Sequence, residues 1–417
     1  MTNDFEQLGV QSFFVKRLEE RNIVKATDIQ KKIIPRLASG ENVFFTSATG
    51  TGKTFAYLIP FLNKLNETPE KEIQTRGESG IKPRLVIIAP TLELCTQIKN
   101  EIDFLLNGTN LKSSLVIGSV SLDRQIEKIR KTRPDIIVGN PNRLLVLANK
   151  KIIRLENIKY LVFDEADRLV SDEMIDDTNE LYKLIKRYAN KKNAGTVITA
   201  CSATISSKYK EKLLFILDDN EKYKPEIIFV NSDDHEILRE KIEHWAIFSE
   251  KRRKDQTLRS LLSAIKAKKS KIKVLIFTSR GDEAALILTR LQHHHVSASG
   301  LIGKVLKKPI SSQERRESLD SFRQGKIEAL VSTDLAARGL DIPGITHVIA
   351  LDVPADSDVY IHRCGRTARA GKRGTMITIG DETQMFLLAS MEKKLKIKVI
   401  PKELHYGQIC APQPIEE

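Results

Sequence analysis

The strongest constraint on the fold of this chain is the regular alternation of short apolar runs with longer, polar and amphipathic stretches such as 92–106 and 122–132. Several runs are almost continuously apolar, as expected for strands buried on both faces. Strands that alternate with helices predict an α/β fold, in which crossovers wind a parallel sheet. The predicted strands are 42–46, 85–89, 115–117, 136–138, 160–163 and 196–202, and later 274–278, 329–332, 347–351 and 375–379.

A polar stretch, Asn231–Glu236, interrupts this alternation before it starts again. We therefore expect two α/β domains with a short linker between them. The stretch 66–84 is rich in charge, glycine and proline, and predicts a surface loop. The predicted divisions are a first domain at 1–231, a linker at 232–240, a second domain at 241–388 and a short basic C-terminal tail at 389–417.

The chain is basic, with 68 Lys and Arg against 54 Asp and Glu and a net charge of +14. Such a surplus favours a polyanionic partner, because each neutralised phosphate releases counterions. An anionic membrane surface, or a basic surface that is merely solvated, would also fit the charge. No secretory signal or membrane-spanning run is visible. The four cysteines show no CxxC spacing, so we expect no disulfide framework, no zinc site and a cytoplasmic location, with a nucleolar or organellar one left open.

A glycine-rich segment that ends in Gly-Lys-Thr follows the predicted strand 42–46. Its glycines would let backbone N–H groups turn inward around phosphates. Lys53 would reach the β- and γ-phosphates of ATP, and the Thr54 hydroxyl would hold Mg²⁺. A purely structural glycine turn is the alternative, and Ser47 stands where the strict pattern has glycine. The predicted ATP contacts are Ser47, Ala48, Thr49, Gly50, Thr51, Gly52, Lys53 and Thr54.

The acidic segment Asp164-Glu-Ala-Asp167 follows the apolar run 160–163. Carboxylates at the end of a strand belong at the mouth of an α/β sheet, near the phosphate loop. Asp164 would orient Mg²⁺ through water, and Glu165 would position or deprotonate the attacking water. An exposed acidic helix start is the alternative for such a string in isolation.

With these residues the chain resembles the DEAD-box helicases, whose motifs occur in the same order over nearly its whole length. The resemblance implies two tandem RecA-like parallel-sheet domains joined by a short linker. It also implies ATP hydrolysis with Mg²⁺. Within residues 3–31, Phe5 and Gln30 resemble the motif that recognises adenine. A glutamine amide can pair with adenine N6 and N7, and Phe5 could stack on the base.

The remaining motifs are assigned roles by the same resemblance. For the nucleotide, it implies contacts from Gly339 and Asp341, with Asp341 on the ribose. It also implies arginine fingers at Arg366 and Arg369. The predicted catalytic residues are then Lys53, Glu165, Arg366 and Arg369. For RNA, it implies phosphate-backbone contacts from Thr91, Gly118, Arg143 and Thr333. Coupling of ATP state to unwinding is assigned to Asp167, Ser202 and Thr204.

Three departures from the family pattern concern RNA contacts rather than ATP hydrolysis. Leu92 stands where the family has arginine, and Ser119 follows Gly118 where a second glycine is usual. The segment 300–312 is longer than the usual spacing and carries Lys304, Lys307 and Lys308. Since leucine cannot neutralise a phosphate, we expect one phosphate contact fewer in the first domain.

The resemblance implies an enzyme, an ATP hydrolase and RNA helicase. It would unwind short RNA duplexes locally, or remodel ribonucleoproteins, by ATP-driven closure of its two domains on single-stranded RNA. We expect a monomer that acts on single strands and short duplexes, without a membrane and with protein partners unknown. A nucleotide-gated RNA clamp that does not unwind, and a DNA-directed helicase, are the alternatives.

Overall fold

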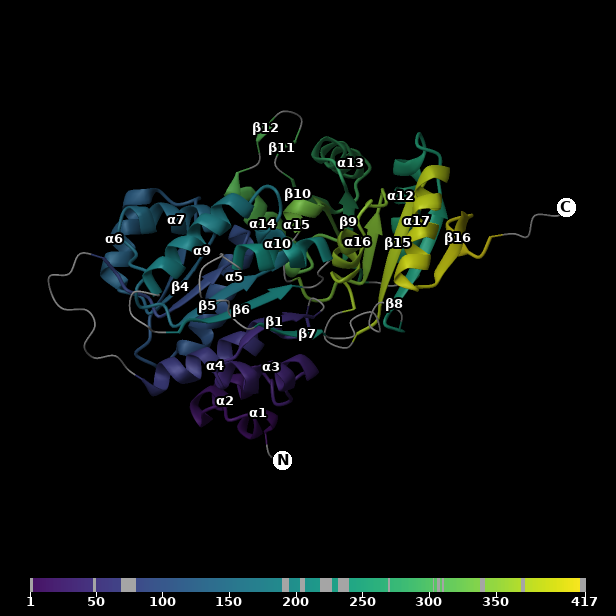
Figure 1. The fold of residues 1–417 in the computed structure, drawn as a ribbon. Coiled ribbons are helices and arrows are strands. Elements are labelled where there is room, and N and C mark those ends of the chain that lie inside the picture. Colours follow the sequence, from purple (N-terminus) through teal and green to yellow (C-terminus); the bar gives the residue numbers. More distant parts are fainter. Residues whose placement is uncertain are drawn as a thin grey trace. The chain divides into compact units, whose positions relative to one another are not determined.

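The residues of the computed structural model fall into two compact units, Met1–Ser232 and Asp233–Glu417. Each unit contains a mainly parallel sheet with helices packed on it (Figure 1). The residues that the structure describes are 3–47, 50–68, 80–189, 195–202, 207–217, 227–231, 240–268, 271–302, 304–305, 308–309, 311–337, 342–368 and 372–412.

The sheet of the first unit is parallel and has the order β3-β4-β2-β5-β6-β1-β7. Its strands are β1 (Asn42–Thr46), β2 (Leu85–Ile88), β3 (Ser113–Val116), β4 (Ile136–Gly139), β5 (Tyr160–Asp164), β6 (Val197–Ser202) and β7 (Ile227–Asn231). β6 pairs with both β1 and β5, with Ser202 opposite Thr46 and Cys201 opposite Asp164. The carboxyl ends of these three strands therefore lie side by side, at the edge where ligands bind in such sheets.

Apolar side chains cover both faces of this sheet, because successive residues of a strand point to opposite sides. On β1, Val43 and Phe45 belong to one buried cluster and Phe44 belongs to the other. Helices α1 to α5 pack into the first cluster, and helices α6 to α10 pack into the second. They are α1 (Asp4–Gln7), α2 (Ser12–Glu19), α3 (Asp28–Ala38), α4 (Lys53–Glu67), α5 (Leu92–Leu106), α6 (Leu122–Thr132), α7 (Pro141–Asn149), α8 (Ala166–Leu169), α9 (Ile175–Ala189) and α10 (Ser207–Leu217).

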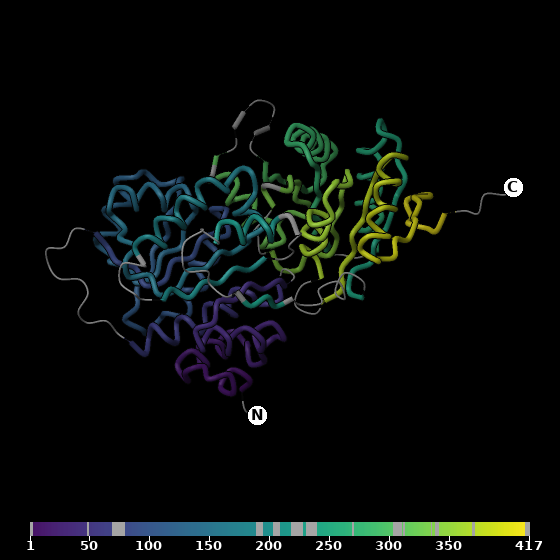
Figure 2. The backbone as a smooth tube through the Cα atoms, in the orientation of Figure 1, coloured from purple at the N-terminus to yellow at the C-terminus, as the bar shows by residue number. Residues whose placement is uncertain are grey.

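The sheet of the second unit has the order β10-β13-β9-β14-β15-β8-β16-β17 and is parallel except for β17. Its backbone can be followed from green to yellow in Figure 2. The strands are β8 (Ile242–Phe248), β9 (Val274–Thr278), β10 (Ala298–Leu301), β13 (Ala329–Thr333), β14 (His347–Ala350), β15 (Gly374–Gly380), β16 (Val399–His405) and β17 (Gln408–Cys410), beside a separate antiparallel pair, β11 (Lys304–Val305) and β12 (Lys308–Pro309).

This second sheet is also buried on both faces. On β9, Leu275 and Phe277 face one cluster, while Val274 and Ile276 face the other. Helices α14 to α17 supply the first of these clusters, and α12 and α13 supply the second. The helices are α12 (Lys254–Lys268), α13 (Gly281–His293), α14 (Ser312–Arg323), α15 (Asp334–Ala337), α16 (Ser357–Cys364) and α17 (Glu382–Leu395).

The predicted α/β class with parallel sheets is confirmed, and some elements agree to the residue. The predicted strands 42–46 and 274–278 are β1 and β9, and the amphipathic stretches 92–106 and 122–132 are α5 and α6. β7, β8 and β10 were not among the predicted strands. In β8, polar Glu243 and His244 interrupt the apolar run, so that its place in the sheet rests on pairing with β15 and β16.

The expectation of a separate C-terminal tail from residue 389 is wrong. α17 runs across that boundary, from Glu382 to Leu395, and β16 then joins the sheet in parallel beside β8. Leu404 and Ile409 pack against the cluster that α12 and α13 supply. The segment belongs to the second unit because its apolar side chains and its backbone hydrogen bonds are both used there.

The predicted surface loop 66–84 is wrong at both of its ends. α4 continues to Glu67, and Arg84 is only 2% exposed. The Arg84 guanidinium pairs with Asp135 at 2.8 Å and donates to the carbonyl of Thr68 at 2.6 Å. Residues 69–79, and residues 232–239 of the predicted linker, lie outside the described residues. In the part that is described, no helix has the length and hydropathy needed to cross a membrane.

Candidate active site

The glycine-rich loop between β1 and α4 has a backbone that requires glycine. Gly50 and Gly52 have φ values of 83° and 92°, in the left-handed region that side chains rarely adopt. A Cβ atom on Gly52 would also lie 2.4 Å from Nε2 of Gln30. The predicted adenine-recognising residue therefore lies directly on the phosphate loop.

The loop is closed by its own polar side chains. Lys53 begins α4, and its ammonium group donates to the backbone carbonyl of Ser47. The hydroxyls of Ser47 and Thr51 are 2.6 Å apart. The N-terminus of a helix such as α4 favours anions, because its N–H groups point outward without partners in the helix. The other two residues predicted in this loop, Ala48 and Thr49, lie outside the described residues.

Asp164 ends β5 beside this loop and is held by donors from three directions. Its Oδ2 accepts from the Tyr57 hydroxyl at 2.8 Å, and its Oδ1 accepts from the Cys201 thiol at 3.1 Å and the Glu165 amide at 2.9 Å. Burial and the neighbouring Asp164 carboxylate raise the pKa of Tyr57 and of Cys201 well above their usual values. Both groups therefore stay protonated at neutral pH and act as donors.

Glu165 has an unusual backbone conformation, with φ at 50°. Left-handed conformations are uncommon for residues with a side chain and cluster at functional sites. The turn starts the short helix α8, and the Glu165 side chain is only half-buried. Two residues later, Asp167 accepts a hydrogen bond of 2.6 Å from Ser202 at the end of β6. Two of the three predicted coupling residues are thus in direct contact.

The side chains predicted to act on Mg²⁺, Thr54 and Asp164, offer only oxygen atoms. Thr54 lies on α4 one turn before Tyr57, and the Tyr57 hydroxyl donates to Asp164 at 2.8 Å. Mg²⁺ prefers oxygen ligands and is usually bound through one or two carboxylates together with substrate phosphates. The residues present therefore fit a magnesium ion held jointly with a nucleotide, where it would neutralise phosphate charge.

The two residues of the predicted adenine motif differ in their surroundings: Gln30 contacts the phosphate loop, and Phe5 lies in the hydrophobic core. Gln30 forms a capping box with Thr27 at the start of α3, and its Nε2 donates to the carbonyl of Gly52 at 3.1 Å. Phe5 is 0% exposed and belongs to the first hydrophobic cluster. Its ring has no exposed face on which a base could stack, so the structure gives Phe5 a core role instead.

The residues predicted to contact RNA from the first unit occupy turns and helix starts. Thr91 caps α5, accepting from the amide of Leu94 at 3.1 Å. Arg143, near the start of α7, donates from Nη2 to the carbonyl of Gly118 at 2.9 Å. Leu92 is half-buried and packs against the first hydrophobic cluster. Leu92 therefore has a packing role on the first cluster.

In the second unit, two of the predicted residues are described, Thr333 at the end of β13 and Arg366 in the turn after α16. Thr333 ends β13, and its hydroxyl accepts from the amide of Ala336 at 3.4 Å. Arg366 follows α16, is 4% exposed and donates from Nε to the carbonyl of His362 at 3.1 Å. The remaining predicted residues, Thr204, Gly339, Asp341 and Arg369, lie outside the described residues.

Arg363 has a structural importance that the sequence prediction missed. Its side chain is 1% exposed and forms a two-bond ion pair with Asp334, at 2.6 Å and 2.8 Å. It also bonds the side chain of Asp352 at 2.8 Å, and that carboxylate accepts from the Ser279 hydroxyl at 2.6 Å. The arginines at 363, 366 and 369 are three residues apart in the sequence. This spacing alone does not distinguish a buried structural arginine from a catalytic one.

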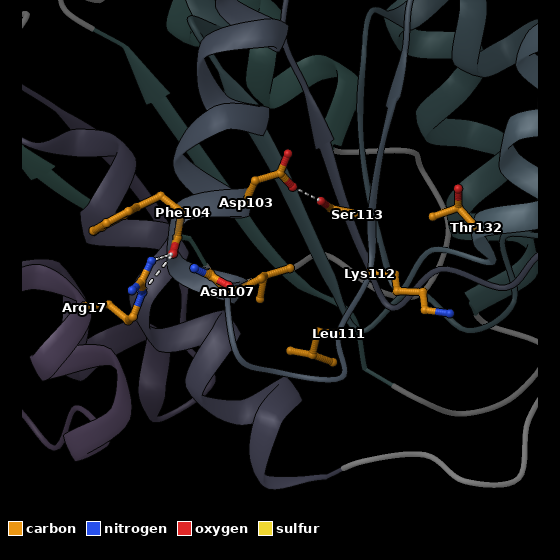
Figure 3. Close-up of a pocket in the computed structure, with 9 residues that line it drawn as sticks. Arg17, Asp103, Phe104, Asn107, Leu111, Lys112, Ser113 and Thr132 are labelled. Atoms are coloured by element: carbon orange, nitrogen blue, oxygen red, sulfur yellow. Dashed lines mark hydrogen bonds between the residues drawn. The ribbon is translucent and has the colours of Figure 1, made fainter.

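A pocket of about 610 Å³ lies elsewhere on the first unit and contains none of the predicted site residues (Figure 3). It lies beside the start of β3 and the end of α5, where Asp103 accepts from Ser113 at 2.7 Å. Arg17 of α2 reaches the same region and donates to the carbonyl of Phe104. The amino ends of parallel strands form the edge of the sheet opposite to the phosphate loop, so this pocket is separate from the candidate active site.

Comparison with known proteins gives consistent matches along the chain. The model of the DEAD/DEAH box helicase family matches residues 27–212, and that of the helicase conserved C-terminal domain matches residues 253–371. The DEAD-box ATP-dependent RNA helicase CshC of Bacillus cereus is 32% identical over 405 residues, which are 97% of this chain and 95% of the relative. The ATP-dependent RNA helicase RhlB of Vibrio cholerae is 32% identical over 398 residues, covering 94% of this chain and 84% of the relative.

Among solved structures, Mss116p bound to single-stranded RNA and AMP-PNP is similar to this chain with a TM-score of 0.83. The two sequences are 25% identical, and the match covers 100% of this chain and 80% of that one. The fold is thus that of two RecA-like domains. From the motifs, the geometry of the phosphate loop and these matches, we conclude that the chain belongs to the DEAD-box family of ATP-dependent RNA helicases.

Proposed function

We propose that this chain uses ATP and Mg²⁺ to separate short RNA duplexes locally or to remodel ribonucleoproteins. In this proposal ATP and single-stranded RNA both prefer a state in which the two domains, at 1–231 and from 241 onward, have closed on them. Ligands that prefer one state shift the population toward it, and hydrolysis reverses the shift. Glu165 positions the attacking water, while Lys53, Arg366 and Arg369 stabilise phosphate charge.

The observation that carries this proposal is the joining of predicted motifs at one edge of the first sheet. Gln30 bonds the phosphate loop at Gly52, and the Ser47 amide bonds the carbonyl of Ser202 at 3.0 Å. Ser202 in turn bonds Asp167. A change at the phosphate loop can therefore reach Ser202 through one hydrogen bond and Asp167 through a second, which supports coupling of ATP state to RNA state.

A strand-separation assay tests this function. Wild-type protein with ATP and Mg²⁺ should separate a short RNA duplex, while a DNA duplex of the same sequence should stay paired. If ATP slows RNA release but no strands separate, the nucleotide-gated clamp is the better description. Equal stimulation of hydrolysis by DNA and RNA would favour the DNA-directed alternative.

We expect Gln30 to make the enzyme prefer ATP over GTP. Guanine presents O6 where adenine presents N6, and so mismatches the amide. Gln30→Glu keeps the oxygen that caps α3 but loses the amide donor. The preference for ATP should fall roughly tenfold or more, because a bidentate amide–adenine pair is worth about 1–3 kcal/mol. The measurement is the ratio of kcat/KM for the two nucleotides.

Gln125→Glu is the matched control for this prediction. Gln125 is also buried in the first unit, and its amide also donates to a backbone carbonyl, that of Ile117. The control should keep the wild-type preference. A Gln30→Glu enzyme that still prefers ATP as strongly as wild type would exclude Gln30 from base recognition.

We expect Leu92→Arg to strengthen binding to single-stranded RNA. An arginine there adds one phosphate contact, so the log–log slope of affinity against salt should steepen by about 0.7. The effect should be the same for any RNA sequence, because phosphate contacts position rather than specify. The measurement is RNA affinity across a salt series with a non-hydrolysable ATP analogue present.

Val24→Arg is the matched control, since it adds the same charge at an exposed apolar residue between α2 and α3. Its salt slope should match wild type. Coinciding slopes for Leu92→Arg and Val24→Arg would mean that position 92 does not face the RNA. In that case the lysines at 304, 307 and 308 would be the next candidates for phosphate contact.

A further inference from the structure

The Asp164 carboxylate is almost fully buried, and its acceptor positions are nearly all used. Its exposed fraction is 4%, and among the described residues three donors reach it. They come from α4, from β6 and from the next residue of the chain, through Tyr57, Cys201 and Glu165. An ionised carboxylate has about four lone-pair positions, so about one remains for a further donor.

Tyr57 connects this carboxylate to the start of α4. Its hydroxyl is 0% exposed and donates to Asp164 Oδ2 at 2.8 Å. One phenol of α4 thus fixes the orientation of the carboxylate that was predicted to act on the metal.

We propose that Tyr57 and Cys201 are positioning residues for ATP hydrolysis, which hold Asp164 with one open acceptor so that it acts on Mg²⁺ through a bound water. The proposal rests on the magnesium-dependent function proposed above. Groups that orient a metal-binding side chain commonly affect metal affinity 10–100-fold when they are removed. Neither residue touches the nucleotide in this proposal, and both act through Asp164.

The alternative is that the Tyr57 hydroxyl is bonded only because a buried hydroxyl needs some partner. Under that alternative, Tyr57→Phe would lower stability but leave the magnesium dependence unchanged. The positioning role predicts instead that the magnesium dependence changes. The phenylalanine ring occupies the same space, but Asp164 loses the donor to its Oδ2. The two roles are therefore separated by a magnesium titration rather than by activity alone.

The test measures binding of a fluorescent ATP analogue to full-length protein over a series of Mg²⁺ concentrations. For Tyr57→Phe we expect the half-saturating Mg²⁺ concentration to rise about tenfold. Nucleotide affinity in EDTA should stay within about twofold of wild type. An unchanged magnesium curve in Tyr57→Phe would overturn the proposal. A wild-type protein whose nucleotide binding does not depend on Mg²⁺ would instead overturn the proposed function.

Tyr160→Phe is the matched control. Tyr160 is half-buried at the opposite end of β5, four residues before Asp164, and its ring stacks on Phe61. At about 3.3 Å per residue its side chain starts more than 10 Å from the carboxylate. This variant should keep the wild-type magnesium curve. A shift as large as that of Tyr57→Phe would mean that any lost tyrosine hydroxyl in this unit perturbs the site.

Two substitutions at Cys201 test the second donor independently. Cys201→Ser keeps a hydrogen-bond donor, so its magnesium curve should stay within about twofold of wild type. Cys201→Ala removes the donor and should shift the curve in the same direction as Tyr57→Phe, by a smaller factor because a thiol is a weak donor. Equal shifts in both variants would overturn the role of the thiol and leave Cys201 as a packing residue.

Discussion

Replacing Glu165 by glutamine is expected to slow ATP hydrolysis by roughly 10²–10⁴-fold, the range that a positioned acid or base contributes. Glutamine has nearly the same shape but cannot accept a proton from water. Phosphoryl transfer needs little beyond positioning and charge neutralisation, so loss of the residue that positions water has a large effect. Single-turnover hydrolysis with saturating RNA is the measurement.

The structure makes this substitution a clean one. Glu165 has a left-handed backbone, and glutamine suffers the same strain there as glutamate. The contact from the Glu165 amide to Asp164 uses the backbone and is kept in the variant. ATP affinity and RNA affinity should therefore stay within about threefold of wild type, since the backbone and the charges that bind phosphate remain.

Glu180→Gln is the control. Glu180 is exposed on α9, and this substitution removes the same charge from the same unit. It should hydrolyse ATP as wild type does. Wild-type turnover in Glu165→Gln would remove Glu165 from the catalytic role. In that case another carboxylate, with Asp164 the first candidate, would have to activate the water.

Arg366→Ala is expected to lower RNA-stimulated hydrolysis by about 10³–10⁵-fold while most ATP binding remains. An arginine finger stabilises the charge that develops in the transition state, so kcat falls much more than affinity. Arg369→Ala should behave in the same way. Arg366→Lys should not restore the rate, because an ammonium group lacks the planar fork of a guanidinium. The measurements are kcat and the Kd of ATP.

Arg363 provides the contrast within the same motif. Its buried guanidinium is held by Asp334 and Asp352, so Arg363→Ala leaves two partly buried carboxylates without their partner. Breaking such a pair costs about 3–5 kcal/mol, so we expect this variant to unfold at a lower temperature. Arg366→Ala should keep a melting temperature closer to wild type. If Arg366→Ala loses affinity and stability but keeps turnover, its role is structural.

The sequence by itself determined the fold class and most of the elements that hold the chemistry. Strands buried on both faces must be nearly continuous in apolar residues, and this made β1, β2 and β5 recognisable. The left-handed glycines of the phosphate loop and the acidic residues after β5 were recognisable for a similar reason. In each case the local backbone or the local chemistry allows few residue types, so the residue types predict the local structure.

Only the tertiary structure decided which residues of a motif lie inside. Phe5 was expected on a base and is in the core, whereas Arg363 was assigned no role from the sequence and is buried and held by two aspartates. Tyr57 has no motif signal beyond an apolar helix face, yet it meets Asp164, 107 residues away. Residues 389–412 were expected to be a basic tail because the side chains of β16 are only partly buried and several of them are polar. Burial and long-range hydrogen bonding depend on what the sheet brings together, and neither is visible in the residues of one segment.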